Sequence, residues 1–215
     1  RKVRGSFDWD GTFWESRLAR PIDIYPEYRS TMPFWGGTQD SEGKFRLSNV
    51  FLEIGTDEGL KGVFGPTSDA VAYIIATQLR ELLLGKDPLA SELLWDQMHR
   101  SLVHGRQGEA MWAVSVVDCA LWDLKGLVFG APVHKLIGGP TRQEVPAYAS
   151  MLGYDVEDQG LVRQRAKETQ NAGYTAQKWF FRHGPMSGPE GLDKNVALVK
   201  TLRETLGDHD AIMLD

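Results

Sequence analysis

The sequence predicts an α+β segment over residues 1–140, followed by parallel βαβ units over residues 141–215. In the first part a strand hairpin precedes three amphipathic helices, whereas after Gly138-Gly139-Pro140 short apolar strands alternate with helices. Strands that alternate with helices at this spacing form right-handed units with parallel strands. With 42% hydrophobic residues, the 215-residue chain can bury at least one full core.

Residues 1–47 are rich in Trp, Pro, Gly and charged residues and show no sustained helical or strand period. We therefore expect long loops here. Their many aromatic residues either pack as a cover or form a contact surface for a ligand.

A hairpin is expected next. Val50, Leu52 and Ile54 alternate with other residues, residues 56–59 (TDEG) make a turn, and residues 60–64 return as a strand.

Three helices then follow the hairpin. A helix over residues 68–84 has Ser68 or Asp69 as its N-cap, and a second amphipathic helix covers residues 91–102. The clearest pattern is that of residues 108–129, whose apolar residues recur at three- and four-residue spacing. We expect this third helix to be buried along one face.

The second part contains three expected strands, at residues 145–150, 176–181 and 211–215, and two helices, at about 155–172 and 191–206. Three parallel strands fit an open doubly wound sheet or the start of a (β/α)8 barrel, which takes about 250 residues. No helix follows the last apolar strand to cover it, so we expect the natural protein to continue beyond Asp215.

Composition excludes several classes of function. The net charge of −5, with acidic and basic residues mixed, leaves no basic stripe for nucleic acid and favours a small ligand. Cys119 is the only cysteine, which excludes an internal disulfide and suits a reducing compartment, so we expect a cytoplasmic protein. No run approaches the roughly eighteen apolar residues of a membrane span. The start, RKVRGSFDWD, lacks the apolar core of a signal peptide.

The run AVSVVDCALWDLKG at residues 113–126, followed by GAPVHKLIGG at 130–139, resembles the mandelate racemase branch of the enolase superfamily. In that family such a helix and its Gly-Gly exit join two domains. The resemblance implies an α+β capping domain at residues 1–140, then a modified (β/α) TIM-type barrel at 141–215, of which only the first three strands are present. It extends over most of residues 15–215.

Two shorter motifs resemble the rhamnonate dehydratase group of that branch. They are Arg20-Pro21 with Tyr25–Tyr28, and Lys178-Trp179-Phe180 with Gly184-Pro185 and Gly188. The resemblance implies a Mg²⁺-dependent carbon–oxygen lyase that acts on a sugar acid (aldonate). Such an enzyme removes the proton alpha to the carboxylate and eliminates the 3-hydroxyl to give a 2-keto-3-deoxy acid. By analogy we also expect a homo-oligomer.

Asp215 stands at the carboxyl end of the last expected strand, where barrel active sites lie, and it resembles the family's first magnesium ligand. Without the family, such an Asp would be taken as a helix cap or a surface acid. Because Mg²⁺ prefers octahedral oxygen coordination, we expect two further acids on later strands.

Lys178 and Phe180 alternate on one face of the second expected strand, where racemases and cycloisomerases of this branch carry a Lys-x-Lys pair. Phe180 in place of the second Lys argues against a two-base racemase and favours a histidine base further downstream. Lys178 then stabilises charge near the substrate carboxylate, or merely reaches solvent at a strand end.

Arg182 and His183 follow in the loop after that strand, where ligand contacts collect in barrels, so we take His183 as a catalytic candidate and Arg182 as a substrate contact. The alternative for His183 is plain exposure. In this family, loops of the capping domain choose the substrate. The candidates there are Arg17, Arg20, Tyr25, Arg29 and Trp35.

Rhamnonate dehydratases place an Arg and a His in this capping segment, whereas the present chain has Met32 near the expected Arg and no His before His99. The identity of the sugar acid is therefore left open, and Arg29 is a substitute that can grip a carboxylate or several hydroxyls. Asp118 and Asp123, five residues apart on a helix, point in different directions and are expected to be structural.

Two alternatives to a dehydratase stay open at this point. One is a racemase or cycloisomerase of the same branch, and the other is a non-catalytic, enolase-like binding protein.

Overall fold

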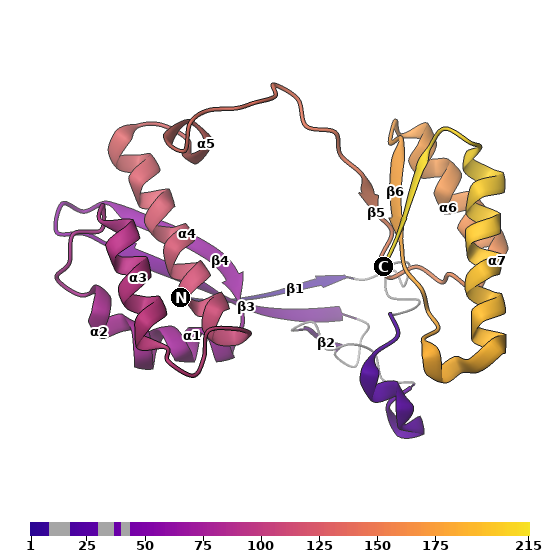
Figure 1. Ribbon diagram of the computed structural model, residues 1–215, viewed down its shortest axis with the longest axis horizontal. Coiled ribbons are helices and arrows are strands. Elements are labelled where there is room, and N and C mark those ends of the chain that lie inside the picture. Colours follow the sequence, from indigo (N-terminus) through magenta and orange to yellow (C-terminus); the bar gives the residue numbers. More distant parts are fainter. Residues whose placement is uncertain (9–17, 30–36, 40–43) are drawn as a thin grey trace. The chain divides into compact units, whose positions relative to one another are not determined.

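The computed structural model of the protein describes residues 1–8, 18–29, 37–39 and 44–215 (Figure 1). The chain divides into two compact units, each made of two stretches: Arg1–Phe7 with Gly36–Gln143, and Asp8–Trp35 with Glu144–Asp215. The domain division at residue 140 stays a prediction. In the part of the chain that is described, no helix is long and apolar enough to cross a membrane.

The first unit contains a four-stranded sheet built around the long strand β3 (Lys44–Gly55). β3 pairs with β1 (Lys2–Asp8), and it pairs in antiparallel fashion with β2 (Gly37–Gln39) and with β4 (Lys61–Thr67) along different parts of its length.

The expected hairpin is confirmed as β3 and β4. Leu52 pairs with Phe64 and Ile54 with Gly62. The turn is closed at Thr56, whose backbone N–H donates to the Leu60 carbonyl at 3.0 Å and whose hydroxyl accepts from the Leu60 N–H at 3.2 Å. Gly59 in this turn has a φ of +84°, a conformation that favours glycine.

The expectation of long loops over residues 1–47 is wrong for several segments. Besides β1, β2 and the start of β3, the structure contains two 3-10 turns, η1 (Pro21–Ile24) and η2 (Pro26–Tyr28). The residues of β1 do not show the apolar pattern of a buried strand, and Val3 is 44% exposed in the structure. Pairing with β3 orders it instead, beginning where the Phe51 N–H donates to the Arg1 carbonyl at 2.8 Å.

The first expected helix forms as α1 (Asp69–Ile74), a π-helical turn η3 (Ile75–Leu79) and α2 (Arg80–Leu83) in succession. Ser68 is its N-cap, because the Ser68 hydroxyl accepts from the Val71 N–H at 3.2 Å.

The second and third helices also form as expected, as α3 (Ser91–Ser101) and α4 (Glu109–Phe129). Gly130 ends α4 with a φ of +59°, and a short helix that was not expected, α5 (Val133–Leu136), follows.

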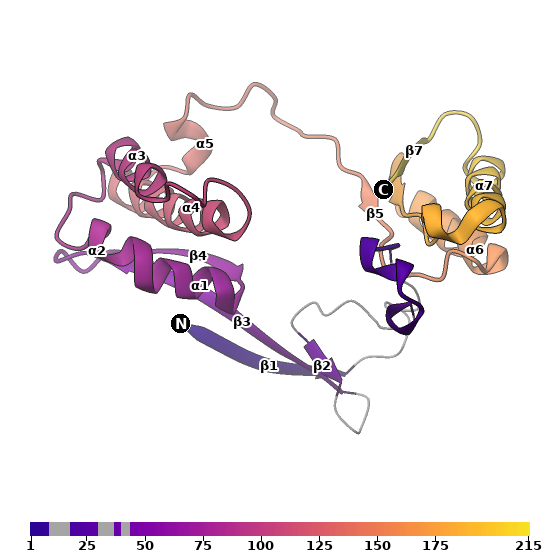
Figure 2. The ribbon, with the colours of Figure 1, turned by 60° about the horizontal axis from the view of Figure 1, so that its bottom comes forward.

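The core of the first unit lies where α4 packs against the other helices and the hairpin, with α3 and α4 stacked on one side of β3 and β4 (Figure 2). Its most deeply buried residues include Leu79, Met98, Ala113, Val114, Val117 and Leu121. Asp123 has the structural role expected of it, since its carboxylate accepts from the Val63 N–H of β4 at 2.8 Å.

The second unit contains a parallel sheet in the order β5 (Ala149–Ser150), β6 (Ala176–Trp179) and β7 (Ala211–Leu214). The helices between the strands are α6 (Gln159–Asn171) and α7 (Gly188–Leu206). The first strand is shorter than the expected 145–150. The chain before it is exposed, and Val145, at 80% exposure, buries little apolar surface.

Both α6 and α7 pack on the same face of this sheet (Figures 1 and 2). A strand order that follows the sequence, with every helix on one face, is the arrangement of consecutive units of a (β/α) barrel. One βαβαβ half of a doubly wound sheet has the same arrangement, so the three strands fit both architectures.

Candidate active site

Lys178 and Asp215 lie on the face of the β5–β6–β7 sheet that is opposite to the helices. Gln177 and Trp179 face the helix layer: both are fully buried, and the Gln177 amide donates to the Ala166 carbonyl of α6 at 2.8 Å. Because successive side chains of a strand alternate, Lys178 faces the other way. Lys178 is level with Met213 of β7, so Asp215, two residues further on, shares its face.

The Lys178 ammonium and the Asp215 carboxylate form an ion pair. Lys178 Nζ lies 2.7 Å from Asp215 Oδ2, and the two side chains are 21% and 47% exposed. The hydrogen bond with Asp215 raises the pKa of the Lys178 amine above its ordinary value, although partial desolvation opposes this. Lys178 Nζ also lies 5.7 Å from the centre of the Tyr148 ring, a residue that precedes β5.

The backbone of Asp215 is fixed against the exit of β6. Its N–H donates to the Trp179 carbonyl, and its carbonyl accepts from the Phe181 N–H, each at 3.0 Å. Phe180 between them is fully buried in the second core cluster, which also contains Trp179. The main chain that carries the carboxylate is therefore held in place.

His183 belongs to a different group of side chains, in the loop between β6 and α7. Its Nε2 lies 3.2 Å from Glu157 Oε1, its Nδ1 lies 3.4 Å from the Ser187 hydroxyl, and its carbonyl accepts from the Asn195 amide at 2.9 Å. An added Cβ on Gly191 of α7 would lie 3.0 Å from the His183 Cβ, so the ring packs closely on the start of that helix.

Glu157 is the centre of that group. Besides His183 it contacts Lys194, whose Nζ lies 3.0 Å from Glu157 Oε1 and 3.4 Å from Glu190 Oε1. Burial acts to raise the pKa of Glu157, but hydrogen bonds from Lys194 and His183 outweigh it, and the pKa of the carboxyl is lowered. These contacts join the loop before α6 to the loop after β6.

Leu18 and Ala19, at the start of the described residues 18–29, lie against the same exit of β6. Leu18 packs on the second core cluster, and the Ala19 N–H donates to the Phe181 carbonyl at 3.5 Å. An added Cβ on Gly184 would lie 3.2 Å from the Ala19 Cβ. This part of the expected specificity segment is thus placed beside the loop that carries Arg182 and His183.

Within that segment the two candidate arginines contact its own backbone. The Arg20 guanidinium donates to the Tyr28 carbonyl at 2.9 Å, and the Arg29 guanidinium donates to the Asp23 carbonyl at 2.8 Å. Tyr25 is 52% exposed and meets Tyr28 edge to face, with ring centres 6.4 Å apart. Both arginines therefore help to hold the η1 and η2 turns in the form seen here.

Arg182 is half-buried in the loop after β6. Arg17 and Trp35, the remaining substrate-binding candidates, lie outside the described residues. The structure thus brings Lys178 and Asp215 together, and it groups His183 with Glu157 and Lys194 instead.

Asp215 fits one position in a magnesium site. Its carboxylate is a hard oxygen donor of the kind that Mg²⁺ prefers, it is half-exposed, and it already attracts a cation, the Lys178 ammonium. Over residues 1–8, 18–29, 37–39 and 44–215, no group of three His, Cys, Asp or Glu side chains is placed to hold a metal ion. Asp215 thus offers a carboxylate of the kind expected for a metal ligand.

Sequence reasoning missed Tyr148 and Glu157. Tyr148 stands two residues before Ser150, which is level with Lys178, so the alternation Tyr-x-Ser could have placed it on the Lys178 face. No local signal links Glu157 to His183, because only the fold brings their two loops together.

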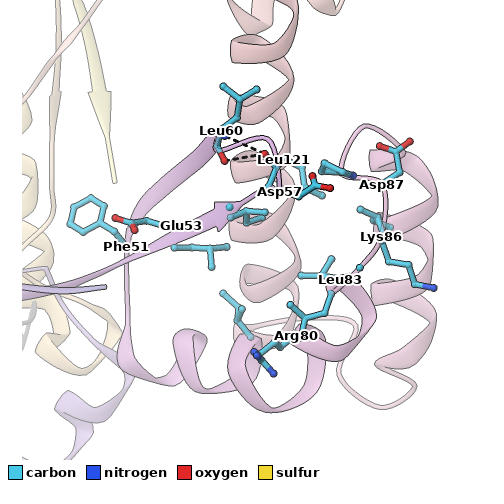
Figure 3. Close-up of a pocket in the computed structure, with 18 of the residues that line it drawn as sticks. Phe51, Glu53, Asp57, Leu60, Arg80, Leu83, Lys86, Asp87 and Leu121 are labelled. Carbon is cyan, nitrogen blue, oxygen red and sulfur yellow. Dashed lines mark hydrogen bonds between the residues drawn. The ribbon is translucent and has the colours of Figure 1, made fainter.

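The first unit contains a separate cavity of about 910 Å³ between β3, the helical segment η3–α2 and the loop at 83–89 (Figure 3). Aliphatic side chains such as Leu83 and Leu121 line it, and charged groups including Glu53, Asp57 and Arg80 also border it. Sequence reasoning did not predict this cavity.

Comparison with known proteins gives the following relatives. Residues 41–138 match the family model described as "Mandelate racemase / muconate lactonizing enzyme, N-terminal domain". The L-rhamnonate dehydratase of Saccharopolyspora erythraea is 33% identical over 203 residues, which are 94% of this chain and 47% of that protein. The chain spans about half the length of the curated relatives it matches.

Similar solved structures include the L-rhamnonate dehydratase of Gibberella zeae, with a TM-score of 0.75 and 29% identity over 99% of this chain and 50% of that one. A racemase of Streptomyces coelicolor A3(2) with bound magnesium has a TM-score of 0.67 and 34% identity, over 78% of this chain and 50% of that one.

Proposed function

Because this chain belongs to the mandelate racemase and muconate lactonizing branch of the enolase superfamily, we propose that the whole protein is a magnesium-dependent dehydratase of a sugar acid. The reaction removes the hydrogen alpha to the carboxylate of an aldonate and eliminates the 3-hydroxyl, which gives a 2-keto-3-deoxy acid. Relatives named as L-rhamnonate dehydratases support this substrate class.

The observation that carries the proposal is the pair of Lys178 and Asp215 at the carboxyl ends of β6 and β7, on the face away from the helices. Barrel enzymes bind substrates at this end of their strands. We accordingly assign residues 1–140 to a capping domain and residues 141–215 to the first three strands of the barrel.

Asp215 would hold the metal through its carboxylate, aided by the backbone bonds that fix its position. When bound, Mg²⁺ would stabilise negative charge on the substrate carboxylate and so make the alpha hydrogen easier to remove. The Lys178 ammonium would add positive charge on the same face of the sheet, which favours an anionic substrate there.

His183 is better suited to positioning than to proton transfer. Its ring is held between Glu157 and Ser187 and packs on α7, so it would fix the loop that carries Arg182. Arg182 would then contact the substrate. Arg20 and Arg29 would act by holding the segment that carries Tyr25, with Arg17 and Trp35 in the parts of that segment outside the described residues.

A panel of aldonates that includes L-rhamnonate tests the proposal. The whole protein, loaded with Mg²⁺, is expected to form a 2-keto-3-deoxy acid from at least one member, detected by carbonyl derivatisation. Asp215→Asn is expected to lose this activity, and Arg163→Gln, a change of an exposed ion pair on α6, to keep it. Failure of the wild-type protein to convert any aldonate would count against the proposal.

A racemase or cycloisomerase is the second candidate, favoured by the 34% identity to the Streptomyces coelicolor racemase. Phe180, which takes the place of the second Lys of the family's pair, argues against it. Exchange of the alpha hydrogen with deuterated solvent, without keto-acid formation, would favour this candidate. Binding of a sugar acid without exchange or product would indicate a non-catalytic protein. We also propose a homo-oligomer, which sedimentation analysis of the whole protein would test.

A further inference from the structure

We propose that Lys178 is the built-in counter-cation of Asp215, so that the lysine ammonium and a divalent metal ion compete for the same carboxylate. This inference rests on the proposed function, which assigns Asp215 to the metal. It adds an exchange step, in which the ammonium leaves Asp215 Oδ2 as the metal takes that oxygen.

The contact between the two groups is close and direct. Lys178 Nζ lies 2.7 Å from Asp215 Oδ2, the distance of a charge-assisted hydrogen bond. Asp215 is also fixed by its own backbone, bonded to Trp179 and Phe181 on the neighbouring strand exit. The backbone that carries the carboxylate is therefore the stationary part of the pair.

Lys178 is the mobile member. Its ammonium sits on a flexible four-carbon chain, which can turn away without any change in the strand. The face of Tyr148 offers a second contact, since Nζ already lies 5.7 Å from the ring centre. A cation near an aromatic face is attracted by the ring, so the displaced ammonium keeps a favourable partner.

The competition has a thermodynamic consequence. A protein whose carboxylate is paired with Lys178 binds metal only in the fraction of molecules where the ammonium has left, so the apparent dissociation constant is raised. Removing the ammonium should therefore tighten metal binding. If the lysine instead served to aim the carboxylate at the metal, removing it would weaken binding.

Calorimetric titration of the metal-free whole protein with Mg²⁺ distinguishes these cases. Lys178→Met keeps a side chain of similar length without the charge, and we expect the Mg²⁺ dissociation constant to fall about two- to fivefold. Lys178→Arg, which keeps the charge, should stay within about twofold of wild type. Lys194→Met removes the lysine of the Glu157 pair in the same unit and should also leave Mg²⁺ affinity unchanged. An unchanged or weaker affinity in Lys178→Met would overturn the proposal.

A measurement on the unmutated protein covers the case in which Lys178→Met does not fold. Acetylation by a small reagent, followed at each lysine by mass spectrometry, reports how free each amine is. We expect the acetylation rate of Lys178 to rise when Mg²⁺ saturates the protein, while that of Lys194 stays constant. A Lys178 rate that does not respond to Mg²⁺ would contradict the exchange.

These readouts are independent of turnover. Conversion of an aldonate without competition would retain the proposed function and reject this inference. Competition without conversion of any aldonate would support this inference and count against the proposed function. A wild-type protein that binds no Mg²⁺ would reject the inference and remove the metal from the proposed function.

Discussion

Gly62 of β4 has no room for a side chain. An added Cβ would lie 2.2 Å from the Ala120 carbonyl oxygen, 2.8 Å from the Leu124 Cβ and 3.0 Å from the Leu124 nitrogen. Two of these atoms are backbone atoms of α4, a helix of 21 residues, so they cannot rotate away. In Gly62→Ala, the strand itself must move off the helix.

The cost follows from this geometry. Overpacking by one carbon costs about 1–3 kcal/mol, and a clash with backbone belongs at the upper end. Displacement of β4 also strains the adjacent bond from the Val63 N–H to the Asp123 carboxylate, worth about 1 kcal/mol. We expect Gly62→Ala to lower the free energy of unfolding by about 3 kcal/mol, a large share of the 5–15 kcal/mol typical of a folded protein.

Urea denaturation followed by circular dichroism measures this loss. Gly55→Ala is the matched control, because Gly55 lies on the paired strand β3, has no positive φ and would meet nothing within 4 Å of an added Cβ. Its expected change is within about 0.5 kcal/mol. Equal stabilities for the two variants would refute the close packing of β4 on α4.

Three further predictions concern single interactions. Gln177→Leu removes the bonds to the Ala166 carbonyl and from the Trp179 indole N–H, and it should cost about 2 kcal/mol in urea denaturation; no loss would show that these buried bonds are dispensable. Ser68→Ala should cost about 1 kcal/mol by removing the cap of α1, whereas exposed Ser115→Ala on α4 should change little; equal effects would contradict the capping role. The ionised Glu157 carboxylate should contribute under about 1 kcal/mol to the free energy of unfolding, because its side chain is 40% exposed. Since the pKa of Glu157 is lowered in the folded protein, this contribution is complete above the ordinary glutamate pKa and is lost as the pH falls through the folded-state pKa. The stability gap between wild type and Glu157→Gln should therefore close in acid, and a gap that does not vary with pH would reject this linkage.

Elements with strong local signals were predicted well from the sequence. α4 has a long apolar period and a terminal glycine, and the βαβ alternation after residue 140 gave the parallel sheet. Ser68 or Asp69 was predicted as the cap, and the structure assigns the role to Ser68, whose hydroxyl accepts from an N–H of the first helical turn.

Elements that depend on pairing were missed. β1 is exposed and owes its order to β3, so its own residues carry no burial pattern. β5 begins only at Ala149, although Val145 looked like part of the strand, because apolar character does not by itself create a partner.

In the candidate site, too, some features could be predicted from the sequence and others depend on the fold. Asp215 and Lys178 could be singled out by their places at strand ends, and the register then brings them together. The contacts of His183 with Glu157, and of Lys178 with Tyr148, join residues that are distant along the chain. They follow from the fold and not from any motif.

Loss of deuterium from carbon 2 of a 2-deuterated aldonate, followed by NMR, tests the central claim most directly. With Mg²⁺, the whole protein should release the label to solvent at the rate at which the 2-keto-3-deoxy acid forms, and Asp215→Asn should slow this release by a factor on the order of 100. Retention of the label in the product, or release that is as fast in Asp215→Asn as in wild type, would contradict it.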